Sequence, residues 1–356
     1  MARLGIVGFT NSGKTTLFNA LTGLDAATAP HPFSTAEPNL GVARIPDPLL
    51  QQAAQLEHSA KVVPATLDLL DLPALTRAGE GTGASLARLR EMDALIMVVR
   101  TFEDEAVSFE ASPSDPVGQV EELLVEMAVA DHDILVRRAD RLAREASSEP
   151  AKRPAATMIA ETAAYLGTGQ ALRAKVWPSD TLQALGDSAP LTLKPALWVI
   201  NHGESEAPGK DVVASVQKAV PTGDIVVAVS ARIEEEASRL STEDRSELWE
   251  GFGLGEGVLA RIVRASYQSL GLISFYTVGP KESRAWTVRA GALAPEAAGK
   301  IHSDLERGFI RAEVATMDQV IEAGGWDEAK RRGRIRVEGK NYVVKPADVI
   351  VVRFSV

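Results

Sequence analysis

The stretch Gly8-Phe9-Thr10-Asn11-Ser12-Gly13-Lys14-Thr15 decides the fold of this chain. It has the spacing Gly-x4-Gly-Lys-Thr, which is typical of a phosphate-binding loop. The apolar residues 4–7 before it are typical of a buried strand, and residues 16–21 after it have helical spacing. The sequence therefore predicts a strand, a phosphate-binding loop and a helix in succession, which is the context that this motif requires.

The residue types of the loop suit a bound phosphate chain. Successive backbone N–H groups and the positive end of the following helix dipole form a concave anion site, and Gly8 and Gly13 leave the backbone free to curl. Lys14 is placed to reach between β- and γ-phosphates, and the Thr15 hydroxyl to ligate Mg²⁺. The alternative is a glycine-rich turn that happens to carry a lysine, and the strand, the spacing and the hydroxyl argue against it.

The composition of the 356 residues bounds the class of protein. The length allows two or three domains, and an apolar content of 45% is ample for packed cores. No apolar run approaches the roughly 20 residues of a membrane helix, no secretory leader is recognisable, and cysteine is absent. We therefore expect a soluble, cytoplasmic protein without disulfides. Its net charge of −10 argues against indiscriminate binding to nucleic acid, although net charge hides local patches.

Apolar runs in the first hundred residues predict the strands of a sheet. Residues 41–45 and 65–70 are strand candidates, and the second of them runs into Asp71. An acid at the carboxyl end of a strand beside a phosphate loop is where a nucleotidase holds Mg²⁺ through water. Because residues 94–99 are continuously apolar, we expect a doubly wound, mostly parallel α/β sheet covered on both faces.

The chain changes character between residues 115 and 188. Residues 120–127 and 134–139 have helical periodicity and many charges, and a polar break at residues 147–150 precedes a second helical stretch around residues 158–166. This pattern predicts a helical hairpin inserted into the sheet domain. We interpret its charges as a solvated face; the alternative is a projecting arm that docks a partner.

Two further strands end in polar tags. Residues 196–200 are followed by Asn201-His202-Gly203-Glu204, and residues 225–229 by Ser230-Ala231-Arg232. Ligands of a doubly wound sheet bind beyond the carboxyl ends of its strands, so both tags are expected to contact a nucleotide base. Short β-like runs beyond residue 273 predict a small α+β domain.

Several longer stretches resemble the signatures of one family. They are Asn19-Ala20-Leu21-Thr22, residues 32–39, Phe102-Glu103-Asp104, residues 191–195, Arg284-Ala285-Trp286-Thr287, residues 301–304 and residues 308–312. Together with the phosphate loop, the strand-end Asp71 and the Asn-x-x-Glu tag, they are spread over nearly the whole length of the chain. On these motifs the chain resembles the Obg-like ATPases, the YchF group of the translation-factor GTPase class.

The resemblance implies a domain order and an activity. It implies a P-loop G domain at residues 1–114 and 191–272, an inserted helical arm at 115–190, and a C-terminal β-grasp (TGS) domain at 273–356. It also implies ATP hydrolysis with ATP preferred over GTP, and association with the ribosome or ribosomal RNA. No membrane partner is implied, and we expect a monomer.

The site residues follow from the same resemblance. Those for the phosphates are Asn11, Ser12, Gly13, Lys14, Thr15 and Thr16, and those for the base are Asn201, His202, Glu204 and Ser230. Thr15, Thr35 and Asp71 would hold Mg²⁺. Lys14, Thr35 and Asp71 would serve hydrolysis, and Thr35 is the switch residue whose hydroxyl and carbonyl can close on a γ-phosphate.

The choice of base depends on Asn201 and Glu204. Guanine selection in this class usually comes from Asn-Lys-x-Asp, whose short carboxylate accepts two hydrogen bonds from guanine. Here His202 replaces the Lys and Glu204 the Asp. The longer carboxylate would crowd guanine, whereas Asn201 and the backbone near His202 can meet the adenine amino group. ATP is the predicted nucleotide; the alternatives are a site without strong base preference, and a tag that merely caps the next helix.

The segment after Asp71 departs from the family pattern. The family continues as Asp-x-Ala-Gly-Leu, whereas this chain reads Asp71-Leu72-Pro73-Ala74-Leu75 with a shorter following loop. Ala74 keeps the N–H that contacts a γ-phosphate, but a positive φ there would cost of order 1 kcal/mol. Because no glutamine orients the attacking water, we expect turnover near the roughly 10⁻⁴ s⁻¹ of unassisted GTPases. Ala74→Gly should raise hydrolysis.

A basic stretch marks the C-terminal region. It runs Lys330-Arg331-Arg332-Gly333-Arg334-Ile335-Arg336 with Lys340 and Lys345, and Glu338 is the one acid among residues 330–345. Such an excess can contact a phosphate backbone, with ordinary solvated charge as the alternative. The sequence thus predicts a slow, ribosome-associated ATPase switch. The alternatives are a nucleotide-gated ribosome- or RNA-binding module with negligible hydrolysis, and a conventional GTPase assembly factor.

Overall fold

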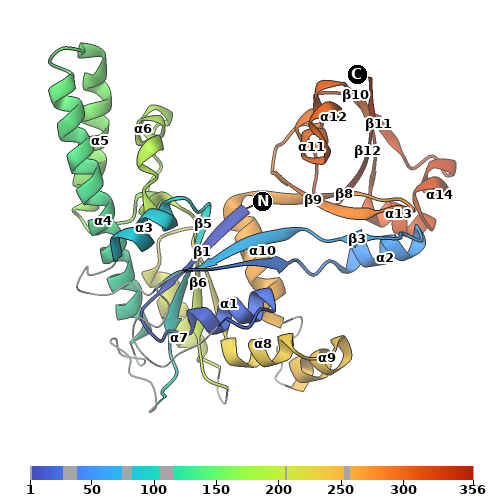
Figure 1. Ribbon diagram of the computed structural model, residues 1–356, viewed down its shortest axis with the longest axis horizontal. Helices are drawn as coiled ribbons and strands as arrows, with labels where there is room; N and C mark the ends of the chain where they lie inside the picture. Colours follow the sequence, from blue (N-terminus) through green and yellow to red (C-terminus); the bar gives the residue numbers. More distant parts are fainter. Residues whose placement is uncertain are drawn as a thin grey trace. The chain divides into compact units, whose positions relative to one another are not determined.

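A computed structural model of the chain describes residues 2–26, 38–73, 82–104, 115–204, 207–251 and 257–355 (Figure 1). The chain divides into two compact units. The first unit comprises Ala2–Val42 and Asp68–Ser269, and the second comprises Ala43–Leu67 together with the chain from Leu270 onward. Each unit is built on a six-stranded sheet.

The sheet of the first unit has the strand order β2-β4-β1-β5-β6-β7. Its strands are β1 (Ala2–Gly8), β2 (Asn39–Arg44), β4 (Thr66–Asp71), β5 (Ala94–Arg100), β6 (Ala196–Asn201) and β7 (Ile225–Val229). β5 pairs in parallel with β1 and with β6, and β6 with β7. Every residue of β5 and β6 is buried, because both faces of the sheet are covered. The predicted doubly wound α/β fold is confirmed.

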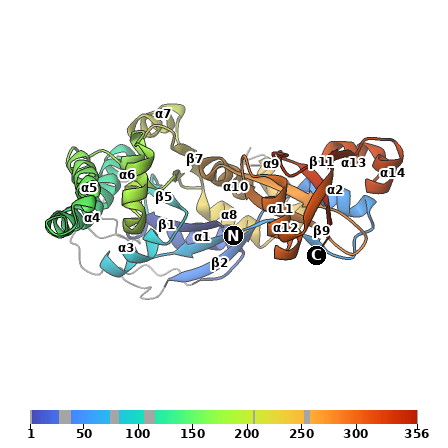
Figure 2. The same ribbon diagram turned by 90° about the horizontal axis from the view of Figure 1, so that it is seen from above.

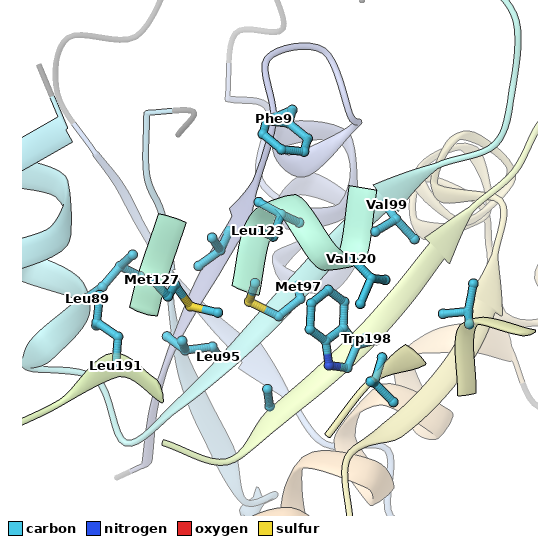
Figure 3. Packing of buried hydrophobic residues seen from close by; sticks show 14 of the residues in the cluster. Phe9, Leu89, Leu95, Met97, Val99, Val120, Leu123, Met127, Leu191 and Trp198 are labelled. Carbon is cyan, nitrogen blue, oxygen red and sulfur yellow. The ribbon is translucent and has the colours of Figure 1, made fainter. Parts of the chain in front are cut away.

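Helices cover this sheet. They are α1 (Lys14–Thr22), α3 (Thr82–Arg90), α4 (Pro116–Glu145), α7 (Lys210–Ala219), α8 (Ala231–Ser238), α9 (Thr242–Gly251) and α10 (Gly257–Leu270). α1 packs beside α8, and α4 beside α7. Figure 3 shows the core between the sheet and α4, where Met97 and Trp198 pack with Val120, Leu123 and Met127. All five side chains are fully buried, so the base of α4 belongs to the sheet domain.

The predicted helical hairpin lies between β5 and β6. α4 is 30 residues long, and α5 (Arg153–Leu166) returns beside it after the one-turn helix η1 (Pro150–Lys152), as Figures 1 and 2 show. The Asp115 carboxylate caps α4 by accepting a hydrogen bond of 2.8 Å from the Gly118 N–H. The return to β6 passes through η2 (Leu172–Ala174), α6 (Ser179–Leu185), η3 (Gly186–Ser188) and η4 (Leu191–Leu193). No helix in the described ranges has the length and apolar character to cross a membrane.

A buried carboxylate fixes the hairpin to the sheet domain. Asp131 of α4 is 1% exposed. It accepts hydrogen bonds from Arg90 at 2.6 Å, from the Leu191 N–H at 3.0 Å, and from both the N–H and the hydroxyl of Thr192 at 2.7 Å. Arg90 lies in α3, Asp131 in α4, and Leu191 and Thr192 in η4. Because this one carboxylate joins the three elements, the hairpin is attached at a defined angle.

The second unit has the strand order β11-β10-β12-β8-β9-β3. Its strands are β3 (Val62–Val63), β8 (Leu272–Thr277), β9 (Ser283–Arg289), β10 (Phe309–Thr316), β11 (Arg336–Glu338) and β12 (Asp348–Phe354). β8 and β12 run parallel, and β9 and β10 flank them in antiparallel pairing. Its helices are α2 (Pro48–Leu56), α11 (Ala294–Ile301), α12 (Ser303–Arg307), α13 (Met317–Ala323) and α14 (Trp326–Arg331). This mixed sheet with helices is the predicted β-grasp type.

The segment between β2 and β4 contributes to the second unit. Leu50 and Ala53 of α2 are fully buried, in one cluster with Met317, Val320 and Trp326. The short strand β3 adds to the same unit by pairing with β9. The domain bounds expected from the sequence keep all of residues 1–114 outside the C-terminal domain, whereas the structure groups Ala43–Leu67 with it.

Candidate functional site

The phosphate-binding loop lies between β1 and α1, with Gly8 as the last strand residue and Lys14 as the first helical one. Gly13 has a φ of +91°, and a Cβ there would lie 2.1 Å from Asn201 Nδ2. A Cβ on Gly8 would lie 2.7 Å from the carbonyl oxygen of Val98. Gly13 therefore requires glycine for its backbone angle, and both positions require it because a Cβ would come too close to a neighbouring atom.

Donors within the first unit hold the carbonyl groups of this loop. The Phe9 carbonyl accepts hydrogen bonds from the Ser12 N–H at 3.3 Å and from Lys14 Nζ at 2.8 Å. Asn201 Nδ2 donates to the Ser12 carbonyl at 3.0 Å. With its carbonyls engaged in this way, the loop is suited to present N–H groups to an anion. Thr16 follows in the first turn of α1.

Lys14 is the cation of the site. It is 7% exposed, and burial lowers its pKa to about 8, against the opposing attraction of Asp71. A buried ammonium whose charge is disfavoured gains most from an anionic ligand, because that ligand replaces the lost solvation. The environment of Lys14 therefore suits a phosphate chain.

The strand-end acid lies beside the loop, as the sequence predicts. Asp71 Oδ2 accepts hydrogen bonds from the Thr15 hydroxyl at 2.8 Å and from Asn39 Nδ2 at 3.3 Å. Burial raises the pKa of Asp71, and its second oxygen, Oδ1, is buried without a hydrogen-bond partner. A hydroxyl and a carboxylate with a spare oxygen fit Mg²⁺, which keeps water and phosphate ligands around few protein groups. Consistent with this, the described residues contain no group of three or more acids or histidines placed to hold a metal.

Asn201 connects the predicted base site to the phosphate loop. It is 4% exposed. Its Nδ2 donates to the Ser12 carbonyl, and its Oδ1 accepts a hydrogen bond of 3.0 Å from the Ala231 N–H. The next helix, α7, has Gly209 at its N-cap without a side-chain hydrogen bond. Neither Asn201 nor Glu204 therefore caps α7. Asn201 Oδ1 instead accepts from the N–H of Ala231, the first residue of α8 (Ala231–Ser238), so a structural role at a helix start applies to Asn201 there.

The rest of the predicted base site lies around the ends of β6 and β7. The His202 N–H donates to the Val229 carbonyl at 2.8 Å. Glu204 is exposed and forms an ion pair of 2.9 Å with Arg232 Nε. Ser230 precedes α8, is 1% exposed, and has a hydroxyl without a hydrogen-bond partner.

Three buried polar atoms of the predicted site have no hydrogen-bond partner among the described residues. They are Ser12 Oγ, Asp71 Oδ1 and Ser230 Oγ. Buried polar groups are nearly always hydrogen-bonded in folded proteins, so exceptions need an explanation. A polar ligand at the carboxyl ends of the strands would provide one.

Some residues escape the sequence analysis, and some predictions lie outside the described residues. Arg100 and Asn39 contact the predicted site through the Asn11 carbonyl and the Asp71 carboxylate. A charged residue at the end of the apolar run 94–99 was the available signal for Arg100. Thr35, and Ala74 with the loop that follows it, fall outside the part of the chain that the structure describes.

The basic stretch of the second unit is largely paired. Its partners are acids outside the window that the sequence analysis considered. The pairs are Lys330–Glu313 at 3.0 Å, Arg332–Glu328 at 3.0 Å and Arg334–Glu322 at 2.7 Å. Lys340 and Lys345 form no ion pair with any described residue. Lys340 and Lys345 therefore offer charge without an ion pair, while Arg331 and Arg332 share the single carboxylate of Glu328.

Comparison with known proteins identifies the family. Residues 3–136 match the family described as 50S ribosome-binding GTPase. Residues 272–355 match the YchF-GTPase C-terminal family, described as a protein of unknown function (DUF933). The Ribosome-binding ATPase YchF of Haemophilus ducreyi is 39% identical over 360 residues, which cover 99% of each chain. The chain belongs to the YchF family.

Other YchF relatives also match over nearly their full lengths. The Ribosome-binding ATPase YchF of Bacillus subtilis is 35% identical, with 99% of each chain covered. Obg-like ATPase 1 of Danio rerio is 32% identical, with 99% of this chain and 92% of that protein covered. The solved structure of the Schizosaccharomyces pombe YchF GTPase has a TM-score of 0.85 at 25% identity, covering 99% and 97% of the two chains. The resemblance read from the sequence is confirmed.

Proposed function

We propose that the chain is a ribosome-associated, Mg²⁺-dependent ATPase that acts as a slow nucleotide-controlled switch. One observation carries the proposal: the Thr15 hydroxyl and the Asp71 carboxylate are 2.8 Å apart beside the buried Lys14, and one Asp71 oxygen is left without a partner. This is the donor set that Mg²⁺ and a triphosphate need. Relatives named Ribosome-binding ATPase support the same activity and partner.

The residues would divide the work as follows. Lys14 binds the β- and γ-phosphates, and the loop N–H groups from Asn11 to Thr16 surround the β-phosphate. Thr15 and Asp71, with Thr35, would hold Mg²⁺, which when bound neutralises charge that develops on the phosphates. Catalysis then consists mainly of positioning and charge stabilisation, and Ala74 with Leu75 gives slow turnover until a partner completes the site.

Adenine is the proposed base. Asn201 donates to the Ser12 carbonyl and accepts from the Ala231 N–H, and its amide keeps a second N–H and a second lone pair for a base. The backbone near His202 and the Ser230 hydroxyl, which has no hydrogen-bond partner among the described residues, would provide further contacts. The Glu204 carboxylate, which replaces the guanine-binding Asp, is paired with Arg232 at 2.9 Å. A carboxylate that is longer and already paired is a poor acceptor for guanine. GTP remains the competing nucleotide.

The ribosome is the proposed partner, with the protein acting in the cytoplasm as a monomer. Lys340 and Lys345 carry the unpaired positive charge that an RNA backbone would attract, although this excess is smaller than residues 330–345 suggest by themselves.

Single-turnover release of phosphate from ATP, with and without ribosomes, tests the proposal. A ribosome-stimulated release is expected. Tight ATP binding without release under either condition would instead support a nucleotide-gated binding module whose altered segment after Asp71 has lost hydrolysis. Stimulated hydrolysis of GTP alone would support the GTPase assembly factor.

A further inference from the structure

Arg100 is a buried arginine that the predicted machinery does not use. It is the last residue of β5 and is 1% exposed. Its guanidinium donates to the Phe102 carbonyl through Nε at 2.9 Å and to the Asn11 carbonyl at 3.1 Å, and it lies 4.2 Å from the centre of the Phe102 ring. Asn11 belongs to the phosphate-binding loop, so the guanidinium touches the loop from inside the protein.

The loop residue that Arg100 holds has an unfavourable backbone conformation. Asn11 has a φ of +61°. The left-handed region is unfavourable for a non-glycine residue, although asparagine tolerates it better than most. A charge-assisted hydrogen bond to its carbonyl fixes the peptide group that follows Asn11, and so maintains the curl of the anion-binding loop.

The main chain of Arg100 is held in turn by the arm. Gln119, in the first turn of α4, accepts from the Arg100 N–H at 2.8 Å and donates to the Arg100 carbonyl at 2.7 Å. Gln119 is 1% exposed. Its amide therefore replaces a neighbouring strand at this point and links α4 to the end of β5.

The residues after Arg100 extend this junction to the predicted base site. The Thr101 N–H donates to the Asn201 carbonyl at 2.9 Å. Phe102 lies against Gly203, where a Cβ would be 3.5 Å from the Phe102 Cβ. One short segment thus contacts the phosphate loop, the Asn201 tag and the arm helix.

Burying a guanidinium carries a desolvation penalty that an apolar residue would avoid. Burial also lowers the pKa of Arg100. We propose that Arg100 is a positioning residue for nucleotide binding, which holds the phosphate loop in its anion-binding shape and is itself set by Gln119 of the arm. This inference rests on the proposed nucleotide binding. Because Gln119 links α4 to Arg100, any event that shifts the base of α4 changes nucleotide affinity. By reciprocity, nucleotide binding changes the equilibrium of that shift by the same factor.

The variants Arg100→Lys and Gln119→Met test the proposal by calorimetric titration with ATP and ADP, and by steady-state hydrolysis. Arg100→Lys keeps the positive charge but loses the planar guanidinium with its several N–H donors. The affinities for ATP and ADP should therefore fall about equally, by about tenfold, which is the scale of one charged hydrogen bond. The KM for ATP should rise likewise with kcat unchanged, because Arg100 touches no reacting atom. Gln119→Met should act in the same direction, and the double variant should lose less than the product of the two.

Ile159→Val is the matched control. Ile159 is buried in the core of the arm hairpin, so this variant lowers the melting temperature without touching the junction. It should leave ATP affinity unchanged. If the Arg100→Lys and Gln119→Met proteins melt earlier but bind ATP with wild-type affinity, this inference is wrong and the proposed function stands. Wild-type protein that binds neither ATP nor ADP would overturn the proposed function and this inference with it.

Discussion

At the scale of single residues, Lys14 and Gly13 show how the loop is suited to an anion. Burial lowers the pKa of the Lys14 ammonium to about 8. Gly13 has a left-handed backbone that brings it against the Asn201 amide. Both features suit an anion, because phosphate stabilises the protonated form of the lysine and the tight loop supplies N–H groups.

The pKa of Lys14 predicts how ATP affinity depends on pH. Free protein loses the Lys14 proton above a pH of about 8, whereas bound phosphate keeps it. Affinity should therefore be level below this pH and fall above it, by at most about tenfold per pH unit, with up to one proton taken up per ATP. Calorimetry at pH 9 in two buffers of different ionisation enthalpy measures that uptake. A level affinity up to pH 9.5 would contradict the prediction.

The pH dependence that Lys14 gives to folding stability has the opposite sign to that of ATP affinity. The unfolded chain binds the Lys14 proton more tightly than the folded, ligand-free protein does, since its pKa there is near the ordinary value of 10.5. The contribution of Lys14 to the free energy of unfolding thus increases as the pH rises from about 8 toward 10.5. A loss of ATP affinity in this range would not reflect unfolding through Lys14.

Gly13→Ala should remove nucleotide binding. The new Cβ would lie 2.1 Å from Asn201 Nδ2, so Asn201 must leave the Ser12 carbonyl and the loop loses a donor. We expect ATP affinity to fall at least about tenfold, the scale of the lost hydrogen bond and backbone strain. Gly23→Ala is the control, since Gly23 has a φ of +68° with no atom within 4 Å of the added Cβ. The account of the loop is wrong if the two variants bind ATP equally well.

At the scale of elements, the attachment of the α4–α5 hairpin depends on one buried acid. Asp131 accepts hydrogen bonds from Arg90 of α3 and from two main-chain N–H groups and one hydroxyl of η4. Together with the Gln119 hydrogen bonds to Arg100, this network holds α4 to the sheet domain at two places.

Asp131→Ala should destabilise the protein strongly. Removing one partner leaves the Arg90 charge and two N–H groups without their acceptor, which typically costs about 3–5 kcal/mol. Urea unfolding followed by circular dichroism measures the loss. Asp140→Ala, at an exposed position of the same helix, should change stability by less than about 0.5 kcal/mol. Equal effects of the two substitutions would show that the network does not anchor the hairpin.

The sequence predicts the elements whose signal is local. The strand–loop–helix around Lys14, the strand that ends at Asp71 and the polar break between α4 and α5 are each visible in one short window. The roles of Arg100 and Gln119 are not visible in this way, because they depend on a contact between β5, α4 and the loop. The ion pairs of the basic stretch are not visible in one window either, because Glu313 and Glu322 lie in other elements.

At the scale of the whole molecule, the chain enters the second unit along β2 and leaves it along β4. The predicted switch residue Thr35 precedes β2, and Asp71 ends β4. The amphipathic pattern of α2 indicates one buried face, but a single sequence does not say which core that face joins. This is why the predicted domain bounds and the two units differ.

The second unit should not fold from its C-terminal part alone. A fragment of residues 270–356 lacks Leu50, Ala53 and β3, and it would expose the cluster around Met317 and Val320. We expect weak or non-cooperative thermal unfolding by circular dichroism, restored by a peptide of residues 43–67. A Leu50→Asp peptide should not restore it. A fragment that melts cooperatively by itself, with no response to the peptide, would contradict this prediction.

The central claim is that Lys14, Thr15 and Asp71 form an ATP site that hydrolyses slowly. Affinity and hydrolysis measured side by side for ATP and GTP with Mg²⁺, on wild-type and Lys14→Ala protein, test it most directly. The account predicts tighter binding of ATP than of GTP, hydrolysis near the roughly 10⁻⁴ s⁻¹ of unassisted enzymes, and loss of both in Lys14→Ala. A clear preference for GTP, or wild-type binding by Lys14→Ala, would contradict it.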